Sequence, residues 1–112
     1  MAGSVKQVCI IGSVFVEHLL NPAGKLIQTQ IGGAAANVCI SLSHLLGKQV
    51  KITLIAMLGT DFLGQSVRKV FEELGNVDLS LVQDVPHQNY SEATIGESKN
   101  AEYKFYRNSQ QQ

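Results

Sequence analysis

The fold of this chain is constrained most by two apolar runs that are rich in β-branched residues. Each run predicts a strand that stops at a glycine, and a predicted helix follows further along the chain. QVCIIGSVFV begins at Gln7 and is typical of a buried strand that closes on Gly12. VKITLIAMLG predicts a second buried strand from Val50 to Leu58. Strands of this kind are usually covered on both faces, so the pattern favours a parallel sheet packed against helices.

Apolar residues recur at helical spacing after each of these runs. A first helix is expected from Ala35 to Leu46, with Gly47 as its stop. A second helix is expected after Asp61, its N-cap, and it ends at Gly75. The apolar stripes comprise Val38, Leu42, Leu45 and Leu46 in the first helix and Val67, Val70, Phe71 and Leu74 in the second.

The remaining segments predict short strands. Residues 18–31 carry an Asn-Pro-Ala-Gly turn and fit a short hairpin or flap. VDLSLVQ predicts a third short strand, and YSEATIG and AEYKFYR predict a hairpin joined by residues 97–100. This alternation indicates an α/β fold, in which loops at the carboxyl ends of parallel strands hold ligands.

Three such loops bring glycines to one edge of the expected sheet: residues 12–17, 32–33 and 59–64. In the second, Gly32 and Gly33 precede three alanines and Asn37, at the mouth of the first helix. This favours either close packing of helix and strand or a ligand near the helix start. The Asn37 amide offers donors and acceptors, which suits a neutral polyhydroxylated ligand.

Two carboxylates share this edge. Glu17 follows the first strand, where an isolated glutamate is more often solvated than functional. Asp61 lies between Gly59 and Gly64, and a capping role is at least as plausible for it as contact with a ligand.

Charge and cysteine spacing exclude several classes of function. Nine basic and nine acidic residues balance, which argues against a nucleic-acid or acidic-membrane surface. Cys9 and Cys39 show no metal-ligand spacing and are expected to be buried free thiols in a reducing compartment. The N-terminal apolar run is too short to span a bilayer, so we expect a cytoplasmic protein. Neither a dinucleotide fingerprint nor a Walker loop occurs.

Taken in order, these motifs resemble the ribokinase-like, or PfkB-type, carbohydrate kinase family over residues 5–107. The family signature is G-G-x-x-x-N before a helix ending in L-G, then a strand ending in G-x-D-x-x-G, then a helix ending in L-G before V-D. The matching residues are Gly32, Gly33, Asn37, Leu46, Gly47, Gly59, Asp61, Gly64, Leu74, Gly75, Val77 and Asp78. NPAGKLIQTQIGG is most similar to the pseudouridine kinase branch.

The resemblance implies a partial doubly wound, Rossmann-like sheet with a small β lid, in which residues 1–112 form the N-terminal portion of a kinase domain. Lid segments would cover about 18–31 and 91–106. By the same resemblance Glu17, Gly32, Gly33 and Asn37 would bind substrate, with Gly59, Asp61 and Gly64 as a secondary, structural edge. The family usually has Asn and Asp where this chain has Phe15 and Glu17.

The resemblance also implies ATP and Mg²⁺ as cofactors, bound in a C-terminal half that carries a G-A-G-D signature. No G-x-G-D occurs in this sequence. We therefore expect an N-terminal substrate-binding portion of an ATP-dependent sugar or nucleoside kinase, inactive alone, with no catalytic or metal-binding residue in this chain. The alternative is a truncated relic that binds a sugar or a protein. Self-association through the lid or an exposed sheet edge is expected.

Overall fold

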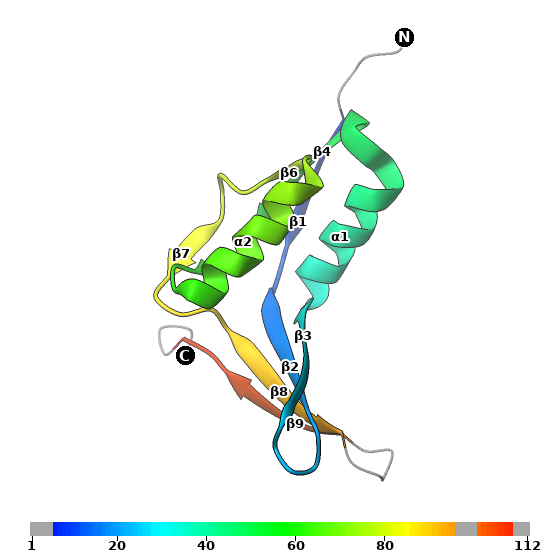
Figure 1. Cartoon of the computed structure of the whole chain (residues 1–112). Coiled ribbons are helices and arrows are strands. Elements are labelled where there is room, and N and C mark those ends of the chain that lie inside the picture. The colour runs from blue at the N-terminus through cyan, green and yellow to red at the C-terminus, as the bar shows by residue number, and fades with distance from the viewer. Residues whose placement is uncertain (1–5, 96–100, 109–112) are drawn as a thin grey trace.

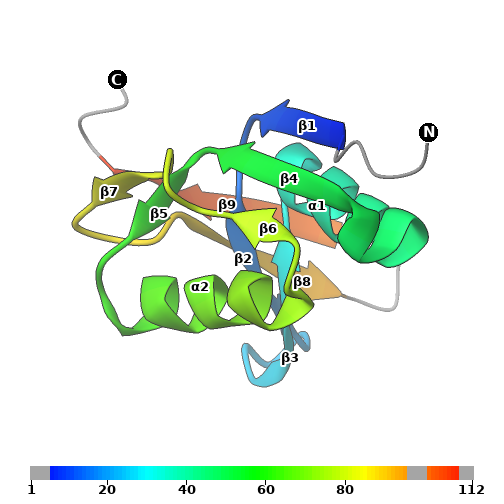
Figure 2. The same ribbon diagram turned by 90° about the horizontal axis from the view of Figure 1, so that it is seen from above.

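The computed structural model describes residues 6–95 and 101–108, with the side chains of residues 101 and 102 outside the description. A parallel sheet forms the centre: β1 (Lys6–Ile11), β4 (Val50–Ile55) and β6 (Val77–Asp78). β4 lies between the other two, as Figure 2 shows. The expected α/β fold is confirmed.

Two helices of equal length cover this sheet (Figure 1). α1 (Ala34–Leu46) runs into a short 3-10 turn, η1 (Gly47–Gln49), and α2 (Phe62–Leu74) ends at Gly75 in the left-handed conformation, with φ 84°. The Asp61 side chain accepts a hydrogen bond from the Gly64 backbone N–H, so its expected role as N-cap is confirmed.

Both helices pack on the same face of the sheet. The connections β1 to β4 and β4 to β6 step in one direction, and right-handed crossovers in one direction place their helices on one face. The largest fully buried apolar side chains are Phe71, Ile52, Leu54, Leu58, Val67 and Cys39. The other face is open, where Ile11 is 75% exposed.

That open face corrects the expectation for one cysteine. Cys39 on α1 is buried, but Cys9 on β1 is exposed, because alternate residues of β1 point away from the helices. Both thiols are free.

The buried stripe of α1 also differs from the expectation. Its buried residues are Ala35, Ala36, Cys39 and Ser43, whereas Val38, Leu45 and Leu46 are exposed and Leu42 is only partly buried. Small side chains let α1 approach the strands, and the hydroxyl of Ser43 donates a 2.5 Å hydrogen bond to Asn76 Oδ1. In the expected stripe of α2, Val67 and Phe71 are buried, Leu74 is partly buried and Val70 is 39% exposed.

A second sheet, here called the small sheet, has the order β3-β2-β8-β9 and extends away from the helices (Figure 1). Its strands are β2 (Phe15–Leu20), β3 (Leu26–Gly32), β8 (Tyr90–Ile95) and β9 (Ala101–Tyr106). The strand predicted to close on Gly12 is confirmed as β1. Residues 15–17, expected in the loop after it, instead begin β2, because the chain leaves one sheet at Gly12 and enters the other at Phe15. The expected hairpins are confirmed as β2–β3 and β8–β9, although residues 97–100 lie outside the described part.

A two-stranded parallel pair joins the sheets: β5 (Met57–Gly59) and β7 (Gln83–Val85). The run predicted from Val50 to Leu58 is thus divided at Ala56, and VDLSLVQ is not one strand but β6, a turn and the start of β7. The turn begins where Asp78 Oδ1 accepts from the Ser80 backbone N–H at 2.9 Å. No helix within residues 6–95 and 101–108 is long and apolar enough to cross a membrane.

Candidate functional site

A pocket of about 310 Å³ lies at the carboxyl end of β1, where the chain passes from the parallel sheet to the small sheet. This volume is at the lower end of the range for small-molecule sites, roughly 300–1,000 Å³. The pocket is lined by Gly12, Ser13, Val14, Phe15, Met57, Asn89 and Arg107. It therefore forms at the edge where parallel α/β sheets hold ligands.

The glycine before α1 packs directly behind this loop. Gly33 has φ 96°, and a Cβ there would lie 2.5 Å from the backbone oxygen of Ser13. The Ala35 backbone N–H donates to the same oxygen at 3.2 Å, and a Cβ on Gly12 would lie 3.1 Å from the Ala35 Cβ. Close packing, one of the two readings open from sequence, therefore explains Gly33.

Glu17 and Gly32 face each other across the hairpin β2–β3. A Cβ on Gly32 would collide with the Glu17 carboxylate, so the glycine makes room for it. Glu17 is half-buried and accepts a 2.9 Å hydrogen bond from Gln30 Nε2. Since side chains alternate along a strand, Glu17 lies on the same face of the small sheet as Phe15.

Asn37 lies exposed in the first turn of α1, where its backbone N–H donates to Gly33 O at 3.0 Å. The lining of the 310 Å³ pocket includes none of the four predicted substrate-binding residues, Glu17, Gly32, Gly33 and Asn37. Gly33 lies behind its wall, and Glu17 shares a sheet face with Phe15, which does line it. Their role in binding substrate stays a prediction.

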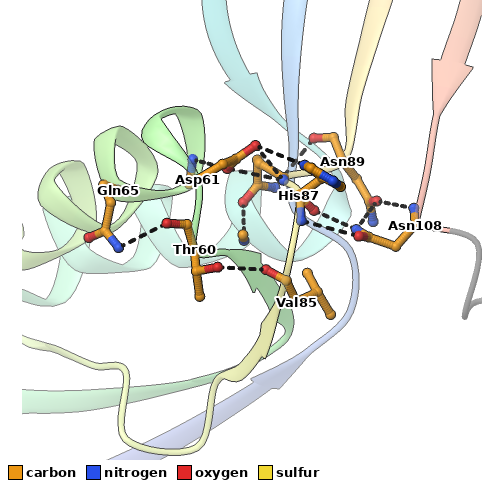
Figure 3. A network of polar contacts seen from close by, with 10 residues as sticks. Thr60, Asp61, Gln65, Val85, His87, Asn89 and Asn108 are labelled. Atoms are coloured by element: carbon orange, nitrogen blue, oxygen red, sulfur yellow. Dashed lines mark hydrogen bonds and ion pairs between the residues drawn. The ribbon is translucent and has the colours of Figure 1, made fainter.

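The expected secondary edge is a tightly packed corner. A Cβ on Gly64 would overlap the Gly59 backbone, and a Cβ on Gly59 would collide with the backbone of Gln88. Asp61 Oδ1 accepts from Gly64 N–H at 2.9 Å and from Gln88 N–H at 3.2 Å, and Asp61 Oδ2 lies 3.8 Å from His87 Nδ1. These contacts, shown in Figure 3, account for all three residues structurally.

The side chain of Gln88, which sequence reasoning missed, connects this corner to the pocket. It is 2% exposed; its Oε1 accepts from Gly59 N–H at 2.8 Å, and its Nε2 donates to Val14 O at 3.1 Å. Asn89 Oδ1 in turn accepts from the backbone and side-chain nitrogens of Asn108, both at 3.0 Å (Figure 3). The polar run His-Gln-Asn before β8 was the available sequence signal.

Arg107, also missed, brings a positive charge to the pocket. Its guanidinium carbon lies 5.2 Å from the ring centre of Phe15 and 5.5 Å from that of Phe105, a cation–π arrangement. The two rings meet edge to face, with centres 5.8 Å apart. The signal was a cation ending the aromatic run YKFYR.

We tested whether the chain offers residues for the cofactors implied by the family. Within the described residues no three His, Cys, Asp or Glu side chains group so that they could hold a metal ion. The pocket lining contains no carboxylate and no lysine. The described residues of this lining therefore do not fit Mg²⁺, and no phosphoryl-transfer step is assigned to them.

Comparison with known proteins agrees with this architecture. The structure is similar to a fructokinase with bound ATP from Xylella fastidiosa, with TM-score 0.76 and 21% identity over 93% of this chain and 31% of that one. It is also similar to an uncharacterized sugar kinase from Pyrococcus horikoshii (TM-score 0.72, 21% identity, 88% of this chain and 35% of the other). A ribokinase from Giardia lamblia gives TM-score 0.69 and 18% identity over 91% of this chain and 33% of that one.

The chain thus spans about a third of the length of these structures, and at such identities the likeness shows the fold. No curated protein matches the sequence. No finding supports the pseudouridine kinase branch. A family model described as pfkB family carbohydrate kinase matches residues 5–112, and the chain therefore belongs to the pfkB family of carbohydrate kinases.

Proposed function

We propose that this chain is the N-terminal, substrate-binding portion of an ATP-dependent kinase that phosphorylates a hydroxyl of a sugar or nucleoside. The observation that carries the proposal is the 310 Å³ pocket between the carboxyl end of β1 and the small sheet. Membership of the family supports the reaction class. The small sheet would act as the lid, through the segments 18–31 and 91–106.

In this proposal four polar side chains bind substrate hydroxyls. Ser13 and Asn89 contribute hydroxyl and amide groups from the lining, and Glu17 on β2 and Asn37 on α1 would contribute from outside it. Gly33 holds α1 against the loop that forms the wall. ATP, bound outside these residues, supplies the γ-phosphoryl group, as the fructokinase with bound ATP suggests for the family.

One observation favours the alternative of a non-catalytic module that binds a partner. The open face of the parallel sheet carries Cys9 and Ile11, and Phe62 at the start of α2 is 88% exposed. Such apolar surface suits a protein contact, including self-association. The two free thiols support a cytoplasmic location in either case.

Equilibrium binding tests the proposal. We expect D-ribose or D-fructose to bind the 112-residue chain saturably, and Ser13→Phe to abolish binding by filling the pocket. Ser41→Phe, on the exposed surface of α1, is the matched control and should leave binding unchanged. Binding that survives Ser13→Phe would contradict the assigned site, and failure of every sugar, neutral or anionic, to bind would contradict the function. We expect no turnover of ATP by this chain.

A further inference from the structure

The two arginines of the chain lie in opposite situations. Arg68 is fully engaged: its guanidinium donates to Asp84 Oδ1 at 2.6 Å, to Leu58 O at 3.2 Å and to Gly59 O at 3.4 Å. Arg107 makes no hydrogen bond or ion pair with the described residues, those whose side chains are placed at 6–95 and 103–108, and its side chain is exposed at the pocket. Its charge is therefore available to a ligand.

The two phenylalanine rings hold this charge in place. The guanidinium lies within 5.2 and 5.5 Å of the ring centres of Phe15 and Phe105, and Phe15 itself lines the pocket. A cation–π contact uses none of the guanidinium N–H groups in a hydrogen bond to an oxygen, so these donors stay free for other partners. Arg107 is thus pre-organised as a donor beside the pocket.

The carboxylates around the pocket already have partners. Glu17 accepts from Gln30, and Asp61 accepts from two backbone N–H groups. Glu92, on β8, accepts a 2.8 Å hydrogen bond from the Tyr106 hydroxyl. Phe105 pairs with Ser91 rather than Glu92, so Glu92 lies on the opposite face of the small sheet from that ring. Among the described residues, none of these three carboxylates forms an ion pair with Arg107.

A second donor supports Arg107 within the same lining. Asn89 is 7% exposed and its Oδ1 is occupied by Asn108, so its side-chain amide presents the NH₂ group as a donor. A planar fork of N–H donors with a neighbouring amide NH₂ matches the oxygens of a carboxylate or phosphate.

We propose that the substrate carries an anionic group, as in a sugar acid or sugar phosphate, and that Arg107 with Asn89 binds it. This inference rests on the proposed function and selects among its substrates. It also favours an anionic sugar over a nucleoside, because Arg107 covers the phenylalanine faces on which a base would stack.

The test compares D-glucose, D-gluconate and glucose 6-phosphate, which share a carbon skeleton but differ in charge, by calorimetry or NMR titration. We expect one anion to bind at least about tenfold more tightly than glucose, and added salt to reduce that preference. Preference for gluconate identifies a carboxylate, and preference for glucose 6-phosphate identifies a phosphate.

Matched variants assign the effect to one residue. Arg107→Gln should lower anion affinity about tenfold and leave glucose unchanged, with Arg107→Lys intermediate. Lys104→Gln removes the same charge from β9, the strand that leads to Arg107. The register partner of Lys104 is Glu92 on the other face, so this variant should change neither affinity. Equal binding of glucose and both anions, or equal effects of the two Gln variants, would overturn this inference and leave the proposed function standing. Failure of all three compounds to bind would overturn both.

Discussion

Replacement of Gln88 by alanine should destabilise the chain more than its small loss of apolar contact suggests. The Gln88 side chain is 2% exposed, and it satisfies the backbone N–H of Gly59 at 2.8 Å and the backbone oxygen of Val14 at 3.1 Å. Its third partner, the backbone oxygen of Asn89, also accepts from the Val16 N–H and stays bonded. Two buried backbone groups therefore lose a partner in Gln88→Ala.

The magnitude follows from those two groups. A buried donor or acceptor left unsatisfied costs about 1–3 kcal/mol, so Gln88→Ala should lower the free energy of unfolding by about 2–4 kcal/mol, allowing for partial rescue by water. Gln88→Glu keeps an acceptor for Gly59 N–H but loses the donor to Val14 O at neutral pH. Its loss should be comparable to or larger than that of alanine, because a carboxylate is buried.

Urea denaturation followed by circular dichroism measures these differences. Gln65→Ala is the matched control, because the Gln65 side chain is exposed and makes only a 3.5 Å contact with Thr60 O (Figure 3). We expect a change of less than about 0.5 kcal/mol there. If Gln88→Ala and Gln65→Ala lower stability equally, Gln88 does not connect the pocket loop to the corner as argued.

Four further predictions concern the glycines, the helix cap and the thiols. Gly33→Ala should lower the free energy of unfolding by about 1–3 kcal/mol through its φ of 96°, and further through contact with the Ser13 backbone. Gly24→Ala should lower it less, because Gly24 has φ 84° but open space around it. Thermal denaturation compares the two variants. Asp61→Ala removes the N-cap of α2 and should lower the free energy of unfolding by about 1–2 kcal/mol, whereas Asp61→Asn keeps a capping oxygen and should lower it much less. Helicity by circular dichroism and the urea midpoint measure both. Burial raises the pKa of the Cys39 thiol above its ordinary value of 9.0. Because the unfolded chain then releases this proton first, the free energy of unfolding should fall as the pH rises above about 9.0. Cys39→Ala should make that fall less steep. A thiol reagent should modify Cys9 at once and Cys39 only on unfolding; equal rates would contradict the burial assigned to Cys39.

The elements that local signals define were predictable from the sequence. Asp61 caps α2, Gly47 and Gly75 end the two helices, and the Asn-Pro-Ala-Gly turn closes β2–β3. Strand boundaries inside apolar runs were not, since periodicity does not mark where a strand passes from one sheet to another. The buried face of α1 was mistaken because close approach to Gly12 selects small residues over large ones.

The site was only partly predictable, for a related reason. Glycine positions carry a local signature, and those before α1 and α2 were found. Gln88 and Arg107 reach the pocket from the end of the chain, and the bond from Gln88 to Val14 joins residues 74 positions apart. Which polar side chain fills such a position depends on tertiary packing, so a single sequence does not reveal it.

Chemical-shift mapping of the bound ligand tests the central claim most directly. With ¹⁵N-labelled chain and saturating D-gluconate or glucose 6-phosphate, whichever binds more tightly, the account predicts the largest backbone amide shifts at Gly12, Ser13 and Phe15 and at Asn89. Residues on the open face of the parallel sheet, such as Gln7 and Lys51, should shift little. The largest shifts on that open face, with the pocket loop unmoved, would contradict the account.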